Sequence, residues 1–445
     1  MLSSIESPRW TCALGGALAA AAALPRTIPV MHSGPGCAAN FAWTQNGAAG
    51  LQVAGRCAGL SFPATNMQEG EIVFGGAERL HEQLRHTLQI MDGDLYFVLT
   101  GCIPEVIGDD VESVVSGYAA AGKPVIMAST AGFKGNSYFG YEQVLKAVFQ
   151  KIVRPGSAAK RNLVNIWGIP PMMDVFWRGN LRGVEELLGL LGFRVNTFFG
   201  GQASLPSIAN AAAARLNIVL SDVYGVEAAE LFRDIHGVDF ITSPLPLGAA
   251  ASDRFLRRIG RRLEVPAKKI ETIIQRENKR RYDYLEPIID VYNDMEAQRY
   301  AIVIGDANYA CALADFLAED MGWLPELTVI TDVLADDIKA GLLRQREGRS
   351  LIPAQKIIFR SGSREILEAA ADDWTPSNGR YSKRSQPVFV LGSSLDRNLA
   401  QTLGAGHLSV SFPVSNRAVL NRGYTGYGGG LLLMEDVISA FILAR

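Results

Sequence analysis

Two cysteines of the chain follow predicted strands and glycine-containing loops. Cys37 ends a segment, residues 28–37, that predicts a strand and then a Ser-Gly-Pro-Gly loop. Cys102 comes after the predicted strand 95–99 and the dipeptide Thr-Gly. Open α/β sheets bind ligands at the carboxyl ends of their strands. Glycines there let the backbone approach a bulky inorganic group, and backbone N–H groups can donate to its sulfides. Both thiols are therefore candidate metal ligands.

A third cysteine, Cys12, lies among small residues just before the first helical run. Thiolates are soft ligands that suit iron–sulfur clusters. Three are too few for a closed four-cysteine cluster or a structural zinc site, and the sequence contains no C-x-x-C pair. A cluster shared with a second chain, which contributes its own thiolates, would complete the set.

The alternative for each cysteine is that it packs as a small hydrophobic residue. For Cys311, on a predicted helical face, we expect packing. Cys57 lies in a Gly-Arg-Cys-Ala-Gly stretch, and we expect it to have no role, although an extra ligand there stays open.

Composition describes a globular chain with no global signal for a charged partner. Of 445 residues, 48% are hydrophobic and 20% are charged, and the net charge is −2. We therefore expect no nucleic-acid partner and no membrane partner. The apolar stretch 12–24 is too short to span a bilayer, which needs roughly 20 residues, and it predicts a core segment rather than a signal peptide. Five scattered cysteines indicate a reducing, cytoplasmic location.

Short β-branched runs alternate with Gly- or Asp-containing turns and helical patterns along the whole chain. This rhythm predicts an α/β fold with mostly parallel sheets flanked by helices. Besides 95–99, strands are predicted at 124–128, 163–167, 194–198, 217–220, 240–242, 301–304, 327–330, 356–359, 388–391 and 408–412. Helices are predicted at, for example, 181–191 and 310–320.

Two composition changes divide the chain into three predicted Rossmann-like domains. The stretch 154–161 is polar, and the stretch 252–298 is charged and helical, without a strand candidate. We predict a cluster-binding domain at 1–160, a second domain at 161–275, and a third at 276–445 with a helical lead-in. The turn at 305–308 lacks G-x-G-x-x-G spacing and no P-loop motif occurs, so nucleotide binding by this chain is disfavoured.

Several of these segments together resemble the component 1 proteins of nitrogenase and nitrogenase-like reductases. Residues 31–40 resemble the family's His-Gly-x-x-Gly-Cys loop, and residues 101–112 its Cys-x-x-Glu-x-Ile-Gly-Asp-Asp motif. Residues 66–76 resemble its acidic run ending in Val-Phe-Gly-Gly. Residues 411–417 and 423–430 resemble its Gly-Phe-Pro-x-x-Asp-Arg stretch and the following Gly-Tyr-x-Gly. The resemblance covers nearly the whole chain in order.

The resemblance implies a role as an electron-transfer subunit of an oxidoreductase. In that family, homologous α and β chains form an α2β2 heterotetramer, and three cysteines from each chain hold an eight-iron, seven-sulfur cluster at their interface. Cys12, Cys37 and Cys102 match those three positions. An ATP-dependent iron protein would supply the electrons, and no residue of this chain is expected to be catalytic.

Two positions indicate which of the paired chains this one resembles. The family's α chain holds its active-site cofactor through a cysteine in the middle domain and a histidine near the carboxyl end. Here the matching strand ends in Ser221, and no histidine follows Arg417. The chain thus resembles a β-type subunit, with the active-site iron–sulfur cofactor expected only in the α partner.

Departures from the family pattern point to a divergent branch. Ala13 and Leu14 replace the usual Gln-Pro after the first cysteine, and Asn66 stands where the molybdenum β chain has a serine able to ligate the oxidised cluster. We expect a methylthio-alkane reductase, which cleaves C–S bonds of small organic sulfur compounds. The alternatives are a dinitrogen-reducing nitrogenase β subunit, a cofactor-assembly scaffold, which commonly lacks part of the cysteine set, and a tetrapyrrole reductase with a four-iron cluster.

Three further polar positions lie close to these cysteines in the sequence. His32 precedes the Cys37 loop, and we expect it to hydrogen-bond its own loop rather than to handle protons. The Asp109-Asp110 pair is expected to cap a helix. For Glu105, tuning of a cluster and simple solvation both remain open.

Overall fold

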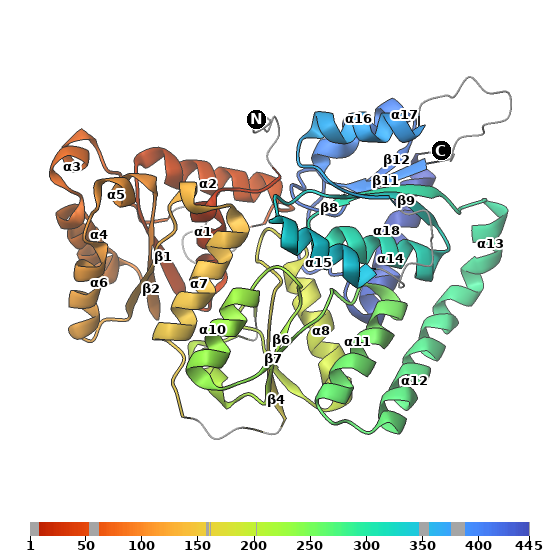
Figure 1. Cartoon of the computed structure of the whole chain (residues 1–445), viewed down its shortest axis with the longest axis horizontal. Helices are drawn as coiled ribbons and strands as arrows, with labels where there is room; N and C mark the ends of the chain where they lie inside the picture. The colour runs from red at the N-terminus through yellow and green to blue at the C-terminus, as the bar shows by residue number, and fades with distance from the viewer. Residues whose placement is uncertain are drawn as a thin grey trace. The chain divides into compact units, whose positions relative to one another are not determined.

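The chain forms two compact units, which a computed structural model describes for residues 9–52, 62–156, 160, 162–201, 203–346, 356–374 and 388–444 (Figure 1). Unit 1 comprises Met1–Arg9, Arg178–Phe193 and Ser243–Arg445, and unit 2 comprises Trp10–Trp177 and Arg194–Thr242. Three sheets are found, and all their strand pairs are parallel in the described residues. The predicted α/β class is confirmed. The boundaries of the three predicted domains remain a prediction.

The first sheet lies in unit 2 and has the order β1-β2-β3. Its strands are β1 (Thr27–His32), β2 (Leu95–Thr100) and β3 (Val125–Ala128), and the last two agree with the predicted strands to within a residue. Helices α4 (Ala77–Ile90) and α6 (Val111–Ala120) supply apolar side chains to the core of one of its faces. Helix α1 (Ala13–Ala23) contacts β1 and β2, and α7 (Ser137–Lys151) contacts β3.

The second sheet also lies in unit 2 and has the order β5-β4-β6-β7. Its strands are β4 (Leu163–Trp167), β5 (Arg194–Asn196), β6 (Leu216–Val219) and β7 (Phe240–Thr242). The prediction that β5 extends to residue 198 is wrong. Phe198 has a φ of 60°, a left-handed conformation that no strand accommodates, so the strand ends at Asn196.

The third sheet lies in unit 1 and has the order β10-β9-β8-β11-β12. Its strands are β8 (Tyr300–Gly305), β9 (Leu324–Ile330), β10 (Lys356–Phe359), β11 (Val388–Gly392) and β12 (Gly406–Ser409). The last strand was predicted to reach residue 412. It ends earlier because Val410 and Ser411 both donate their N–H groups to the Gly392 carbonyl, which bends the chain away.

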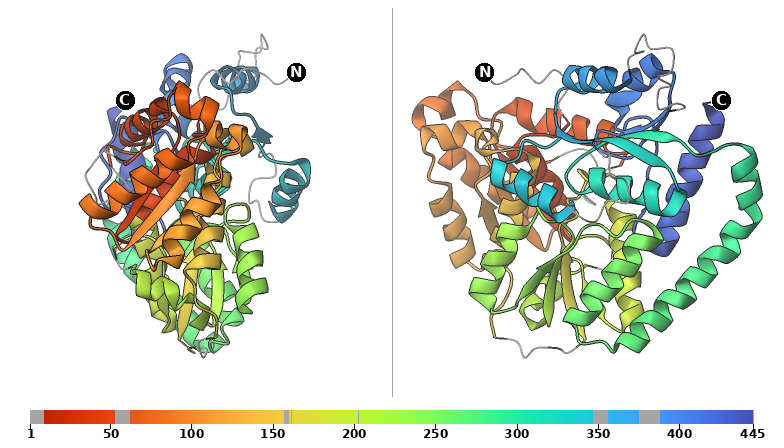
Figure 2. Two further views of the ribbon diagram at one scale, coloured as in Figure 1. Left: turned by 90° about the vertical axis from the view of Figure 1, so that its left-hand side faces the viewer. Right: turned by 45° about the vertical axis from the view of Figure 1, so that its right-hand side comes forward.

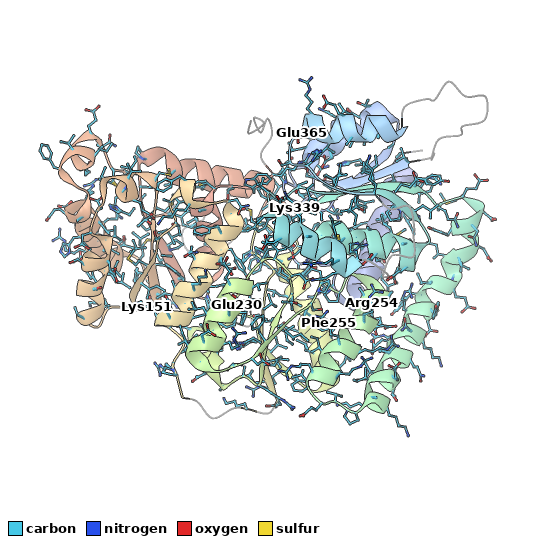
Figure 3. All side chains as sticks on the ribbon, viewed as in Figure 1. Lys151, Glu230, Arg254, Phe255, Lys339 and Glu365 are labelled. Carbon is cyan, nitrogen blue, oxygen red and sulfur yellow. The ribbon has the colours of Figure 1, made fainter. Side chains whose placement is uncertain are left out.

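The charged stretch 252–298 is helical, as predicted. It contains most of α11 (Gly248–Arg262), then α12 (Ala267–Leu285), η3 (Glu286–Ile288) and α13 (Ile289–Asp294). On α11, Phe255 is buried, whereas the neighbouring Arg254 pairs with Glu319 at 2.6 Å (Figure 3). A charged sequence is therefore compatible with a packed helix, since only one face enters the core.

The remaining helices connect these strands and lie beside them (Figure 2). They are α2 (Pro35–Ala48), α3 (Glu69–Phe74), α5 (Cys102–Ile107), η1 (Gly132–Lys134), α8 (Trp177–Leu191), α9 (Leu205–Ala209), η2 (Ala211–Ala213), α10 (Val226–His236), α14 (Tyr309–Met321), α15 (Asp336–Arg346), α16 (Ser363–Trp374), η4 (Ser394–Asp396), α17 (Arg397–Leu403) and α18 (Gly426–Leu443). Among the described helices, α18 alone has the length and apolar composition of a membrane span. It packs against α11, α12 and β12.

Helices α1 and α7 cross with their backbones in contact. A methyl group on Gly16 would lie 1.9 Å from the Ser137 carbonyl oxygen, and one on Gly140 would lie 1.9 Å from the Ala13 carbonyl oxygen. Every residue of α1 is buried, which confirms the predicted core segment. This crossing positions the first turn of α1, and with it Cys12.

We predict that Gly140→Ala destabilises the protein by about 3 kcal/mol, because the new methyl group forces two packed backbones apart. Gly117→Ala is the matched control, since Gly117 is an exposed residue of α6 with nothing within 4 Å of the added methyl group. It should change stability by no more than about 1 kcal/mol, in the favourable direction. Thermal unfolding followed by circular dichroism measures both, and equal midpoints for the two variants would contradict the role of this crossing.

Candidate metal centre

All three candidate cysteines lie at the amino-terminal ends of helices in unit 2. Cys12 is the N-cap residue of α1, Cys37 is the third residue of α2, and Cys102 is the first residue of α5. The last two follow β1 and β2, which are parallel neighbours whose final residues, His32 and Thr100, pair in register. Their loops therefore emerge at one edge of the sheet. The free N–H groups of a helix start stabilise an anion such as a thiolate.

Gly132 brings two of the thiols to one place. A methyl group on Gly132 would lie 3.1 Å from Cys12 Sγ and 3.2 Å from Cys102 Sγ, so both sulfur atoms border the space beside this glycine. Its backbone N–H donates to Cys102 Sγ at 3.2 Å. A larger residue would fill the space that the two sulfur atoms share.

Cys37 belongs to the same electrostatic neighbourhood. Burial raises the pKa of its thiol, the nearby Cys12 and Cys102 raise it further, and a hydrogen bond with Ser33 opposes them. Cys12 and Cys37 are half-buried, whereas Cys102 is exposed, so the site opens to the surface of the unit.

The donor set fits a cluster better than a single ion. Within the described residues, no three His, Cys, Asp or Glu side chains converge closely enough to hold one metal ion. Two soft donors that border one open space, with a backbone N–H aimed at one of the sulfur atoms and a third thiol nearby, suit a group of several irons and sulfides. The three thiols could hold such a group from one side.

Glu105, one helical turn after Cys102, holds the loop that carries Gly132. Its carboxylate accepts hydrogen bonds from Thr100 Oγ1, from Ser129 Oγ at 2.8 Å and from the Ala131 N–H at 3.1 Å, and it pairs with Lys134 at 2.5 Å. Burial raises the pKa of Glu105, but the hydrogen bonds and the Lys134 ammonium outweigh it and keep that pKa below its ordinary value. Glu105 is thus an anionic clamp rather than a solvated side chain.

His32 is fully buried and joins three loops. Its Nε2 lies 3.1 Å from Asp109 Oδ2 and its Nδ1 lies 3.1 Å from Thr65 Oγ1, while the other oxygen of Asp109 accepts the Gly76 N–H at 2.8 Å. Burial lowers the pKa of His32, although Asp109 opposes the shift. The expectation that His32 bonds its own loop is wrong, because its two hydrogen-bond partners, Thr65 and Asp109, come from loops that follow other elements.

The matches with known proteins extend over the whole chain. The family model "Nitrogenase component 1 type Oxidoreductase" matches residues 12–442. The molybdenum–iron protein β chain of Bradyrhizobium diazoefficiens is 25% identical, with 97% of this chain and 83% of that protein covered. The vanadium–iron protein β chain of Trichormus variabilis is 24% identical, with 98% and 94% covered. The solved structure titled "Nitrogenase Cp1 at pH 6.5" is similar with a TM-score of 0.77 at 17% identity, covering 99% of this chain and 94% of that one.

This chain belongs to the nitrogenase component 1 family. It is of the β type, like the two β chains named above. In this component 1 chain, Ser221 is buried and its Oγ accepts the N–H groups of Val223 at 2.9 Å and Tyr224 at 2.7 Å. Ser221, which the resemblance matches to the α-chain cysteine, therefore caps a turn.

The other residues singled out in this component 1 chain have structural roles or lie outside the described part. Asp110 caps α6 by accepting the Ser113 N–H at 3.0 Å, which confirms the capping prediction for this member of the pair. Asn66 is exposed and has a φ of 49°. It lies two residues after Ala64, which forms a parallel bridge with Met31 of β1. Cys311 is half-buried on α14. Cys57 lies outside the described residues.

Sequence reasoning missed Gly132 and the loop around it. The signal was present, since the Ser-Thr-Ala-Gly-Phe-Lys-Gly segment follows β3, a third parallel strand of the same sheet. Gly132 acts through its lack of a side chain and through its backbone N–H. Neither property marks a residue as a candidate ligand in the sequence.

We predict that Glu105→Gln loosens the Gly132 loop, because an amide cannot replace both the ion pair and the set of accepted hydrogen bonds. Amide hydrogens of residues 129–134 should then exchange about tenfold faster, as measured by hydrogen–deuterium exchange mass spectrometry. Glu112→Gln, an exposed change on α6, is the control and should leave this segment as it is. Wild-type exchange in both variants would show that Glu105 does not hold the loop.

Proposed function

We propose that this chain is the β subunit of a nitrogenase-like iron–sulfur reductase. In this proposal Cys12, Cys37 and Cys102 hold one half of an eight-iron, seven-sulfur cluster, and an α-type subunit supplies the other half. The observation that carries it is the placement of Cys12 and Cys102 beside Gly132, with Cys37 on the loop that leaves the same edge of the first sheet. Its family and its β type, both established by sequence, support the same assignment.

The chain's own residues hold and shield the site. The Gly132 N–H donates to Cys102 Sγ and would stabilise negative charge on that sulfur atom. Glu105 keeps the Gly132 loop in place, and the buried His32 joins the loop before Cys37 to Asp109. When bound, the cluster supplies a one-electron relay between the ATP-dependent iron protein and the cofactor of the α subunit.

Exposed apolar side chains near the thiols support a partner surface. Helices α3 and α5 are in contact, and they expose Val73 at 71%, Phe74 at 90% and Val106 at 72%. Phe133, directly after Gly132, is 61% exposed. These large exposed apolar residues lie on α5, which begins at Cys102, on α3 beside it and directly after Gly132, and such side chains are typical of a surface that a partner subunit covers. We propose the α-type chain of an α2β2 heterotetramer as this partner, in a reducing cytoplasm.

Within the family we propose the methylthio-alkane reductase type. Ala13 and Leu14 begin α1 in place of Gln-Pro, and Asn66 replaces the serine that would respond to oxidation of the cluster. A dinitrogen-reducing β subunit is the second candidate, because its relatives include nitrogenase β chains that use molybdenum or vanadium. A cofactor-assembly scaffold is less favoured, since all three cysteines are present.

We expect Cys37→Ala and Cys102→Ala, each produced with the α-type subunit, to lose the paramagnetic signal of the interfacial cluster and most of its about eight irons per αβ pair. Removal of either thiolate leaves an iron without its protein ligand. Cys311→Ala should keep both the signal and the iron. Iron and acid-labile sulfide counting with paramagnetic resonance measures this, and an unchanged spectrum in the first two variants would overturn the ligand assignment.

The branch is tested by giving the anaerobic complex its iron protein, ATP and a strong reductant, with either dimethyl sulfide or dinitrogen as substrate. Reductive C–S cleavage consumes two electrons and two protons and forms methanethiol and methane. We expect these products and little ammonia. Ammonia as the main product would favour the dinitrogen-reducing alternative, and neither product from a complex rich in iron would favour the scaffold.

A further inference from the structure

The third sheet has the strand order of a dinucleotide-binding fold. Counted along the chain from β8, its parallel strands lie in the order 3-2-1-4-5. Sheets of this order bind a nucleotide outside the carboxyl ends of their strands. The phosphates lie at the start of the helix after the first strand, and an acidic residue near the end of the second strand binds the ribose hydroxyls. In unit 1 that helix is α14 and that second strand is β9.

A carboxylate occupies the phosphate position. Asp306 precedes α14, and its Oδ1 accepts the Tyr309 N–H at 2.8 Å while its carbonyl accepts the Ala310 N–H at 2.9 Å. The Asp306 side chain is buried. A phosphate at this helix start would compete for the same N–H groups and would be repelled by the buried negative charge. This agrees with the missing G-x-G-x-x-G spacing, and both observations argue only against the phosphate part of such a ligand.

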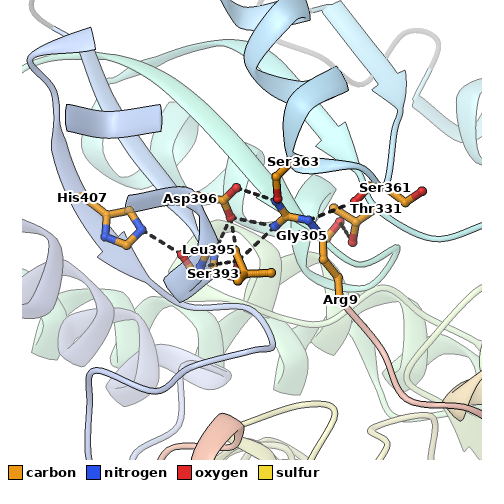
Figure 4. A network of polar contacts seen from close by, with 9 residues as sticks. All are labelled: Arg9, Gly305, Thr331, Ser361, Ser363, Ser393, Leu395, Asp396 and His407. Carbon is orange, nitrogen blue, oxygen red and sulfur yellow. Dashed lines mark hydrogen bonds and ion pairs between the residues drawn. The ribbon is translucent and has the colours of Figure 1, made fainter. Parts of the chain in front are cut away.

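Asp332 stands at the ribose position. It lies two residues after β9, is buried, and accepts the Ala307 N–H at 2.6 Å through its Oδ2. Beside it, Thr331 Oγ1 donates to the Gly305 carbonyl at 3.1 Å, so the ends of β8 and β9 are joined at this edge (Figure 4). A carboxylate has about four acceptor positions, and the two neighbouring hydroxyls of a ribose need two of them.

A cavity of about 510 Å³ is lined by Asp332 and lies at the ends of β9 and β10, next to α15 and α16. Bound small molecules occupy cavities of about 300–1,000 Å³, so a nucleoside fits this volume. Val333 and Phe359 give the cavity an apolar surface against which a base can lie. Glu365 and Glu368, both on α16, also line it, and a carboxylate accepts N–H donors such as the amino group of adenine.

The charge of the lining favours a neutral ligand. Lys339 and Arg360 add two cations to the three carboxylates already named, which leaves one net negative charge. Lys339 pairs with Asp336 at 2.9 Å, and its position on α15 and that of Glu365 on α16 can be seen in Figure 3. A polyphosphate would gain little from such a lining. An uncharged nucleoside meets acceptors, donors and an apolar wall.

The loop after β10, which forms part of the wall, is held without any ligand. Arg9 Nε donates to the Ser361 carbonyl at 3.3 Å, and its guanidinium donates to Ser363 Oγ at 3.2 Å (Figure 4). The same guanidinium donates to both oxygens of Asp396, at 2.7 and 2.8 Å. A cavity whose wall is already ordered loses less entropy when it takes up a ligand.

We propose that this cavity is a binding site for a nucleoside of the adenosine class, without 5′-phosphates. Asp332 binds the two ribose hydroxyls. Val333 and Phe359 contact the base, and its amino group donates to Glu365 or Glu368. All of these residues lie in unit 1, so the site depends neither on the three cysteines nor on the proposed function.

The test is isothermal titration calorimetry on the full-length chain, with adenosine as the probe. Adenosine should bind with one site per chain. 2′,3′-Dideoxyadenosine should bind about tenfold more weakly, because it lacks both hydroxyls that bond to a charged group. Adenosine 5′-diphosphate should also bind more weakly than adenosine, because Asp306 repels its phosphates. Absence of adenosine binding at millimolar concentration, or equal affinity for adenosine and the diphosphate, would overturn the proposal.

Asp332→Asn tests the ribose contact and keeps the shape of the side chain. It should weaken adenosine binding by about tenfold and leave the affinity for 2′,3′-dideoxyadenosine unchanged, because only the first ligand has hydroxyls to bond. A purely structural role of Asp332 would weaken both ligands equally. Equal weakening, or no weakening, would therefore overturn the assignment of Asp332 to the ribose.

Val333→Glu keeps the test available if Asp332→Asn does not fold. Val333 is 65% exposed, so the fold should tolerate the change, and the added carboxylate would occupy the apolar surface expected to meet the base. Adenosine should then bind about tenfold more weakly. Val291→Glu is the matched control, since Val291 is a 52% exposed valine of α13 outside the cavity lining, and it should leave the affinity unchanged. Equal affinity of the two glutamate variants for adenosine would show that the nucleoside does not bind in this cavity.

Discussion

The thiol site depends on close backbone approach more than on any single bond. Cys12 reaches the space beside Gly132 only because α1 and α7 cross without a side chain between them, at Gly16 and Gly140. Gly132 in turn comes close to Cys102 because it has no side chain of its own. Three glycines therefore determine where the sulfur atoms lie, although none of them carries a functional group.

Polar side chains then hold the loops next to the thiols in place. Glu105 joins the strand end at Thr100 to the loop after β3, and Asp109 joins His32 to the start of α4. Each carboxylate joins segments that lie far apart in the chain, so these loops are held to one another. The result is a rigid rim around an open site, which is what a cluster held jointly by two chains requires.

Much of the fold and part of this site could be predicted from the sequence. The approach of Cys37 to Cys102 follows from parallel strands, because neighbouring strands end at the same edge of their sheet. For Cys12 no local pattern indicated the approach, and only the family resemblance did, since it depends on packing between α1 and α7. The partner of His32 was also missed, because Asp109 lies 77 residues further along the chain.

The exposure of Cys102 has a consequence for biogenesis under the proposed function. A nucleophilic sulfur at the surface of an unpaired chain is open to peroxide and to other thiols, whereas the same atom in the paired complex is covered. Chains made in excess of the partner subunit would thus be oxidised at Cys102 before they could pair. Balanced synthesis of the two subunits would then limit this loss of unpaired chains, in addition to setting the subunit ratio.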